Sequence, residues 1–506
     1  MTIQVYSEND YKIKPCQTWP KLTLKRSAPM ANASEFVKCR KKPLVYYRGD
    51  FYEWTGTHYK PRSADAIRTE IYSFLNRAEV SVPGRVEGEW QAEPFRPNIT
   101  NVRELFSALK HLEGKTFIPD DIDAPCWLRG GGNKPDARNL IALENSILDL
   151  ETGIALPLSS DFFTMTALPF DYDPEAKCPE WQSFIAGLFP NCEDGQGTRR
   201  EFQKAIGYML SSDRSQQKIF LMKGPPRSGK GTTLRVLAAL LGRENVVSPK
   251  LAELREHFGR QQLIGKKAAF FPDERLDGKT SEIVAWLLSI SGEDDVSIPR
   301  KNRTNWNGRL DAKVWISTNP TPGFEDASAA IAERFVVFKL MHSHSENPDT
   351  GLTGRLLGEL PGILNWAMEG LRMLREDRQF FQPEEAMDEI ERMADIAAPI
   401  RVFVRERMVR EAGRSVELRE AYQAYAGWCE SAGHKPLSRT KFETAILDAF
   451  PDVTRKYEGP RGKQAAVLRG IGLWVAGKQP ETGEHAAEET TGARSNVVSI
   501  ITGGRP

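Results

Sequence analysis

One stretch of the chain combines glycines and a lysine at a spacing that suits phosphate binding. Residues 224–230 read G-x-x-x-x-G-K, and they follow a short apolar segment at 218–222. A helical pattern begins directly afterwards and runs to residue 241. Glycines let backbone N–H groups turn toward phosphate oxygens, and the positive end of the helix dipole favours the same anions. Strand, glycine-rich loop and helix in this order predict a site for a nucleoside triphosphate.

The loop itself supplies the expected nucleotide ligands. Lys230 would reach the β- and γ-phosphates. The residue after it is Gly231, where a serine or threonine usually ligates Mg²⁺. Thr232 therefore either takes over the metal or contacts the α-phosphate, and the sequence leaves both roles open. The expected cofactor-binding residues are Gly224, Pro225, Pro226, Arg227, Ser228, Gly229, Lys230, Gly231 and Thr232.

Two adjacent carboxylates follow the next apolar strand. The segment KKAAFFPDE, residues 266–274, ends in Asp273 and Glu274. We expect Asp273 to hold Mg²⁺ and Glu274 to orient the attacking water, because hydrolysis needs both roles beside the γ-phosphate. The expected cofactors are therefore ATP and Mg²⁺, with Asp273 and Thr232 as candidate metal ligands.

Two further polar residues extend the candidate site. AKVWISTNP, residues 312–320, is typical of a buried strand that ends at Asn319, which can hydrogen-bond the γ-phosphate or the water. A turn-forming asparagine before proline is the alternative. Arg334 follows a helical pattern; it would stabilise charge in a neighbouring subunit's site, or else form a helix-end ion pair. The expected catalytic residues are Lys230, Asp273, Glu274, Asn319 and Arg334.

Length and composition indicate the number of domains, the location of the protein and the state of its cysteines. A single core rarely exceeds about 250–300 residues, so 506 residues predict several domains. No segment approaches the roughly 18 uninterrupted apolar residues of a membrane span, and the N-terminus lacks the apolar core of a secretory signal. We therefore expect a cytoplasmic protein without membrane contact. None of the six cysteines forms a CxxC pair, which indicates scattered reduced thiols.

Patterning along the chain predicts its organisation. A helix is expected at 64–77, and residues 80–97, rich in proline, glycine and glutamate, are interpreted as a loop. The predicted order is a flexible leader at 1–43, an N-terminal α+β region at 44–180, an ATPase core with preceding helices at 181–345, a helical part at 346–397, a C-terminal module at 398–475 and a disordered tail at 476–506.

The sequence around these motifs resembles a known family. ALENSILDLETG, FDYDPEAKCPEW, FQKAIGYML, ISTNP and ELPGILNWAMEGL, together with the glycine-rich loop, resemble phage and plasmid primase–helicases. These are superfamily 3 helicases with poxvirus relatives, and the resemblance covers about residues 44–475. It implies an α/β fold with an AAA+ P-loop ATPase core, an N-terminal α+β and helical collar region, and a C-terminal winged-helix-like domain. It also implies a homo-hexameric ring acting on single-stranded and forked DNA.

Basic residues in two regions supply the expected DNA contacts. By resemblance, residues 291–303 (SGEDDVSIPRKNR) form a loop in the pore of the ring, with Arg300, Lys301 and Arg303 facing phosphates. Arg439 and Lys441 open a helix that precedes a basic hairpin pattern, as in a DNA-binding winged helix. Such phosphate contacts are independent of base sequence, as a translocating motor requires. A packing module with a solvated basic face is the alternative for the second region.

Three functions follow from these features. The first is an ATP-dependent DNA helicase that unwinds DNA for replication of a phage, prophage or plasmid. The second is a P-loop kinase, suggested by GKGT at residues 229–232, although the acid pair argues against it. The third is an origin-binding or loading factor that uses ATP as an assembly switch. Residues 1–140 show no zinc motif and no pattern for nucleotidyl transfer, so a separate primase and host replication proteins are expected partners.

Overall fold

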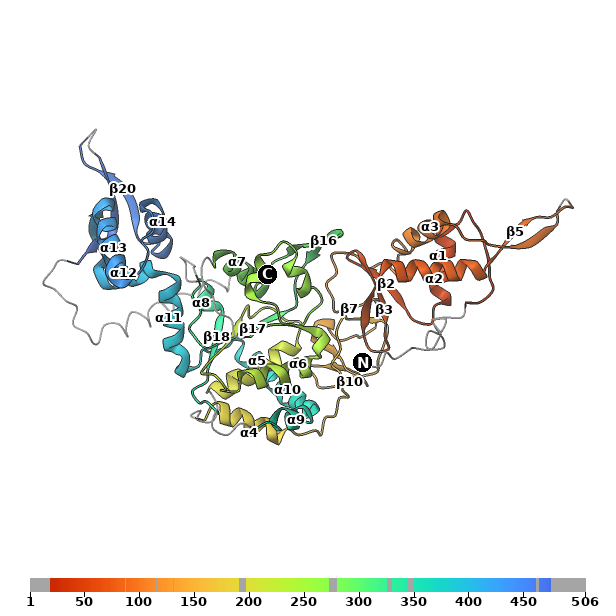
Figure 1. Ribbon diagram of the computed structural model, residues 1–506, viewed down its shortest axis with the longest axis horizontal. Helices are drawn as coiled ribbons and strands as arrows, with labels where there is room; N and C mark the ends of the chain where they lie inside the picture. The colour runs from red at the N-terminus through yellow and green to blue at the C-terminus, as the bar shows by residue number, and fades with distance from the viewer. Residues whose placement is uncertain are drawn as a thin grey trace, which may run out of the picture. The chain divides into compact units, whose positions relative to one another are not determined.

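The computed structural model describes residues 19–86, 88–114, 116–130, 132–190, 197–272, 280–324, 330–344, 349–460 and 464–474. The chain divides into two compact units, Met1–Ala397 and Ala398–Pro506 (Figure 1). In the described part, no helix is long and apolar enough to cross a membrane.

The first unit begins with three helices and two small sheets. The predicted helix at 64–77 is confirmed as α2, and its start is capped by the Ser63 side chain, which accepts the N–H of Ala66. Small antiparallel strands β2, β3 and β4 form one sheet beside these helices. The elements are β1 (Thr23–Leu24), α1 (Pro29–Cys39), β2 (Leu44–Tyr47), β3 (Asp50–Trp54), β4 (Tyr59–Arg62), α2 (Ala64–Arg77), β5 (Glu79–Pro83), β6 (Trp90–Pro94) and α3 (Ile99–Leu109).

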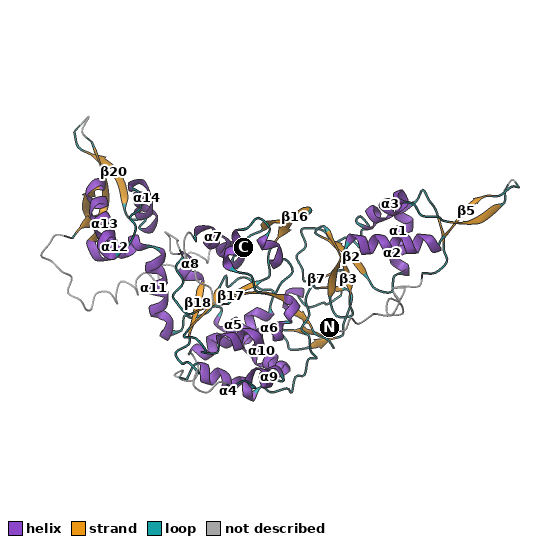
Figure 2. Ribbon diagram, in the orientation of Figure 1, coloured by secondary structure: helices purple, strands orange, loops and turns teal. Residues whose placement is uncertain are grey.

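Two expectations for this region are wrong. Residues 19–43 are not a flexible leader, because Trp19 and Phe36 are buried and stack with ring centroids 5.0 Å apart. The buried face of α1 contains only Phe36 and small residues, so hydrophobic periodicity did not reveal it. Residues 80–97 are not a loop throughout, because β5 and β6 pair there as an antiparallel hairpin (Figure 2). Every residue of β6 is exposed, so the strand lacks the apolar alternation by which strands are recognised.

Short strands connect this region to two helices of the core. The sheet of β10, β9 and β8 is antiparallel, and α5 is buried along most of its length. Helix α4 starts with a proline, and the Glu359 carboxylate accepts the N–H groups of Glu180 and Trp181 there. The elements are β7 (Cys126–Trp127), β8 (Leu140–Ala142), β9 (Ile147–Asp149), β10 (Ala155–Leu156), β11 (Phe162–Phe163), α4 (Pro179–Leu188) and α5 (Thr198–Leu210).

A five-stranded parallel sheet forms the centre of the first unit, in the order β13-β14-β17-β12-β18. Both faces are covered, so its strands are continuous apolar runs, as expected for a buried parallel sheet. The elements are β12 (Ile219–Lys223), α6 (Lys230–Leu241), β13 (Val246–Val247), β14 (Ala268–Phe271), α7 (Ser281–Ser291), β15 (Val296–Arg300), β16 (Arg303–Gly308), β17 (Lys313–Thr318), α8 (Ala330–Arg334) and β18 (Phe335–Lys339).

Three more helices of the first unit lie in the described residues after β18. Helix α10 packs along α5 and α9 packs on α6, both on one side of the sheet, while α11 contributes Met393 to the core on the other side. The helices are α9 (Leu352–Leu357), α10 (Leu360–Asp377) and α11 (Met387–Ala397). The predicted helical character of 346–397 thus belongs to the same compact unit as the sheet.

In its described residues, the second unit has three helices and an antiparallel sheet in the order β19-β21-β20. Its core is aromatic: Phe403, Tyr425, Trp428 and Phe442 form ring contacts with centroids 4.7 to 6.3 Å apart. The elements are α12 (Pro399–Arg407), β19 (Met408–Glu417), α13 (Leu418–Ala432), α14 (Arg439–Ala449), β20 (Thr454–Glu458) and β21 (Ala465–Leu473). Helix α14 therefore leads directly into a β-hairpin.

Candidate functional site

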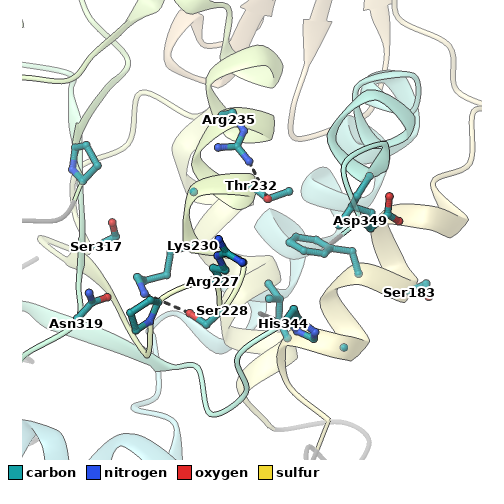
Figure 3. Close-up of a pocket in the computed structure, with 18 of the residues that line it drawn as sticks. Ser183, Arg227, Ser228, Lys230, Thr232, Arg235, Ser317, Asn319, His344 and Asp349 are labelled. Atoms are coloured by element: carbon teal, nitrogen blue, oxygen red, sulfur yellow. Dashed lines mark hydrogen bonds between the residues drawn. The ribbon is translucent and has the colours of Figure 1, made fainter. Parts of the chain in front are cut away.

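The loop between β12 and α6 is the centre of the candidate site (Figure 3). Lys230 is the first residue of α6, and its Nζ donates to the carbonyl oxygens of Gly224 at 2.7 Å and Pro225 at 2.8 Å. The lysine is 6% exposed, so its charge is held under the loop beside the positive end of a helix. A buried ammonium next to a helix N-terminus suits a multiply charged anion.

Two positions in this loop require glycine for different reasons. Gly229 has φ +95°, and a Cβ there would lie 2.5 Å from Cδ2 of Leu188 in α4. A Cβ on Gly224 would lie 2.7 Å from the Leu340 carbonyl oxygen. The loop is thus pressed between α4 and the end of β18, and side chains at these positions would displace it.

A cavity of about 910 Å³ opens over the loop. The carboxyl ends of β12, β14 and β17 meet at this edge of the sheet, which is where open α/β sheets bind ligands. Figure 3 shows Lys230, Ser317 and Asn319 on one side of the cavity and Ser183 and Asp349 on the other. The residues predicted from the loop and from the strand end are therefore brought together.

Asn319 reaches the loop because of the strand order. It follows β17, which pairs with β12 in parallel, and the Gly224 N–H donates to the Thr318 carbonyl oxygen at 3.3 Å. Asn319 lines the same cavity as Lys230. A side-chain amide at this place offers a hydrogen bond to a group bound over the loop.

The expected metal ligands are only partly described. Asp273 and Glu274 lie outside the described residues, although Pro272, just before them, lines the cavity. Thr232 also lines it, and its Oγ1 accepts a hydrogen bond from Arg235 Nη2 at 3.0 Å. Within the described ranges, no group of three or more His, Cys, Asp or Glu residues is placed to hold a metal. The Mg²⁺ site therefore stays a prediction.

Arg334 does not line this cavity. It ends α8 just before β18, and its guanidinium donates to the side-chain and backbone oxygens of Gln217, two residues before β12. Because β12 and β18 are parallel, Arg334 lies at the amino edge of the sheet, opposite the cavity. Among the residues that the structure describes, Arg334 is thus paired with Gln217 and with no acidic side chain.

Sequence reasoning missed the wall of the cavity that lies beyond the loop. Phe184 comes from α4, and Leu352 and Arg355 come from α9. Arg355 is held by ion pairs to Glu180 at 3.2 Å and Asp349 at 2.6 Å. These residues carry no motif, so only the packing of α4 and α9 around α6 could reveal them.

The hairpin of β15 and β16 carries the three residues expected to face DNA phosphates. For Arg300 this expectation is wrong: its side chain is 4% exposed, pairs with Asp50, and donates to the Thr304 carbonyl oxygen at 2.8 Å. Arg303, 52% exposed, pairs with the same carboxylate at 2.7 Å. Lys301 lies exposed in the turn. Of the three, Lys301 is the one that Asp50 does not engage.

Arg439 and Lys441 lie exposed in the first turn of α14, in the second unit. Ser438 caps the helix by accepting the Lys441 N–H. Residues 461–463, between β20 and β21, lie outside the described residues. The structure thus places both predicted basic residues on the surface at the start of one helix, which leaves a DNA contact as a prediction.

Three family models match successive parts of the chain. Residues 38–190 match the model described as D5 N terminal like, and residues 398–480 match the one described as Poxvirus D5 protein-like. Residues 222–334, which run from the glycine-rich loop to Arg334, match a family of unknown function, DUF5906. These two matches support a primase–helicase family of the D5 type for this chain. The matches to D5-type models point to a role in DNA replication.

Individual proteins that match the chain have low sequence identity to it. An uncharacterized mitochondrial protein, ymf21, of Marchantia polymorpha is 26% identical over 129 residues, which cover 24% of this chain and 72% of that protein. An apo structure of the NrS-1 C terminal region has a TM-score of 0.47 at 12% identity, covering 88% of this chain and all of that one. A second apo form has a TM-score of 0.46 at 11% identity, covering 84% and 95%. Because these TM-scores and identities are low, the fold is assigned from the chain's own strand order.

Proposed function

We propose that the chain is an ATP-dependent DNA helicase of superfamily 3 that unwinds DNA for replication of a phage, prophage or plasmid. The observation that carries this proposal is the cavity of about 910 Å³ that Lys230 and Asn319 share at the carboxyl edge of the parallel sheet. Its size and its basic floor suit a nucleoside triphosphate.

The triphosphate would bind along the loop of residues 224–232. Lys230 now donates to two carbonyl oxygens of that loop, and phosphate oxygens would replace them as stronger, charged acceptors. Mg²⁺, held by Asp273 with Thr232 as a further candidate, would neutralise charge on the phosphates. Glu274 would orient the attacking water and Asn319 would hydrogen-bond the γ-phosphate.

The sheet and the position of Arg334 support an AAA+ core that works as a ring. Arg334 sits at the amino edge of the sheet, remote from the cavity of its own chain. In a homo-hexamer, we place it at the cavity of the adjacent subunit, where it would stabilise charge during hydrolysis. Single-stranded and forked DNA would meet the β15–β16 hairpin, with Arg439 and Lys441 of α14 as a second contact.

The decisive experiment is strand displacement on forked DNA with ATP and Mg²⁺. Lys230→Ala and Glu274→Gln should abolish unwinding, while Lys250→Ala, an exposed lysine outside the cavity, should leave it unchanged. Unwinding that survives Lys230→Ala would contradict the motor assignment. DNA-stimulated ATP hydrolysis without unwinding by the wild type would instead favour an ATP-switched origin-binding or loading factor.

A further inference from the structure

The β15–β16 hairpin is tied to the turn between β2 and β3. The Asp50 carboxylate uses both of its oxygens: Oδ2 accepts from Arg300 Nη1 at 2.5 Å, and Oδ1 accepts from Arg303 Nη1 at 2.7 Å. Arg300 also donates through Nη2 to the Arg48 carbonyl oxygen at 3.3 Å. One acidic residue of the N-terminal region therefore fixes two basic residues that lie about 250 positions later in the chain.

In a second contact, the arginine comes from the turn between β2 and β3 and lies against the hairpin. The Arg48 guanidinium lies 5.3 Å from the ring centroid of Trp306, a buried residue of β16, and pairs with Asp123 at 2.8 Å. A Cβ on Gly308, at the end of β16, would lie 2.0 Å from Arg48 Nη1. The hairpin thus leaves room for Arg48 at a position without a side chain.

A glycine also leaves space for an arginine in the turn between β2 and β3. Gly49 has φ +88°, and a Cβ there would lie 2.8 Å from Arg300 Nη2. In each segment, a glycine therefore leaves space for an arginine of the other segment. The residues that make these contacts are named the Asp50 clasp. They are Arg48, Gly49, Asp50, Arg300, Arg303 and Gly308.

We infer that Asp50 is a positioning residue that withholds Arg300 and Arg303 from nucleic acid and presents Lys301, at the hairpin turn, to a phosphate backbone. The inference rests on the proposed function, because it takes the hairpin as a DNA contact. The one negative charge of Asp50 offsets part of the positive charge of the two arginines, and the ion pairs hold their guanidiniums against the N-terminal region. Arginines held in this way displace fewer counterions from a nucleic acid than free arginines do.

The clasp makes a measurable difference to the salt dependence of binding. Each phosphate contact on single-stranded DNA adds about 0.7 to the magnitude of the slope of log K against log salt. Releasing one or both arginines should therefore steepen the slope by about 0.7 to 1.4. Loss of Lys301 should make it shallower by about 0.7.

The experiment measures binding of the full chain to a fluorescent single-stranded oligonucleotide over a range of salt concentrations. Asp50→Asn is expected to tighten binding and steepen the slope. The matched control is Asp65→Asn, which makes the same charge change at an acid whose side chain is 91% exposed and paired with Arg68 in the same region. Adding Arg300→Gln and Arg303→Gln to Asp50→Asn should restore the wild-type slope.

The outcomes separate the clasp from the proposed function. If Asp50→Asn behaves like Asp65→Asn while Lys301→Ala still weakens binding, the clasp inference is wrong and the DNA contact stands. If Lys301→Ala has no effect on DNA binding, the placement of DNA at the hairpin fails. Should Asp50→Asn disturb folding, Arg303→Gln alone decides: an unchanged slope supports the clasp, and a shallower slope overturns it.

Discussion

Gly207 of α5 and Gly370 of α10 face each other where the two helices cross. A Cβ on Gly207 would lie 3.0 Å from the Gly370 carbonyl carbon and 2.3 Å from the Ala367 carbonyl oxygen. A Cβ on Gly370 would lie 2.1 Å from the Gln203 carbonyl oxygen. The two backbones are therefore in direct contact, and this contact sets how closely α10 packs beside the core.

Gly370→Ala should destabilise the first unit by about 1–3 kcal/mol, because the added methyl group meets backbone that cannot rotate away. The free energy of unfolding in urea measures this change. Gly354→Ala in α9 is the matched control, since a Cβ there meets nothing within 4 Å. It should leave the protein equally stable or up to about 1 kcal/mol more stable. Equal stability of the two variants would refute the close crossing.

Phe184 should contribute to binding of the nucleobase. Its ring lies 3.5 Å from the position of a Cβ on Gly229, and it lines the cavity beyond the phosphate-binding loop. Aromatic stacking of a base contributes about 1–3 kcal/mol, so Phe184→Ala should weaken ATP binding by about 5- to 150-fold. Binding of inorganic tripolyphosphate, which has no base, should not change.

Calorimetric titration of both ligands measures this difference. Phe258→Ala is the control, because Phe258 is exposed and does not line the cavity. A parallel loss of ATP and tripolyphosphate binding in Phe184→Ala would show that the ring supports the loop rather than the base.

Arg334→Ala subunits should inhibit wild-type subunits when the two are mixed. If Arg334 completes the neighbour's site, each variant subunit inactivates an adjacent site, and ATP hydrolysis falls more steeply than dilution alone requires. Arg243→Ala, an exposed arginine away from the cavity, serves as the mixing control. A linear fall with the fraction of Arg334→Ala would argue against action across a subunit interface.

Lys313 should make stability depend on pH above neutrality. Burial lowers the pKa of Lys313 to about 8, although the nearby Asp311 carboxylate opposes the shift. An unfolded lysine titrates near 10.4, so between about pH 8 and 10.4 the unfolded chain binds more protons than the folded chain. Stability therefore rises with pH through this window, because the cost of burying the charged form disappears.

The comparison with Lys313→Met isolates this effect. The free energy of unfolding of the wild type, relative to Lys313→Met, should increase by about 2 kcal/mol between pH 7 and pH 10. Lys301→Met, at an exposed position, should show no such change relative to the wild type. A constant difference between wild type and Lys313→Met at both pH values would mean that Lys313 is not buried as a charged group.

Local sequence patterns were enough to predict the loop, its flanking strand and helix, and the polar residue at the end of β17. These are local signals: glycine spacing, apolar runs and helical periodicity depend on neighbours within a few residues. Helix α2 has the predicted bounds for the same reason. The parallel strands then had to bring Asn319 to Lys230, because carboxyl ends of such strands share one edge.

Contacts between distant parts of the chain were needed to show which basic residues form ion pairs and what closes the cavity. Arg300 looked like a DNA contact in a run of charged residues, yet its partner, Asp50, lies 250 positions earlier. Phe184 and Arg355 reach the cavity from helices that carry no motif. Burial and ion pairing depend on residues that are distant in sequence and adjacent in space, and no local pattern specifies them.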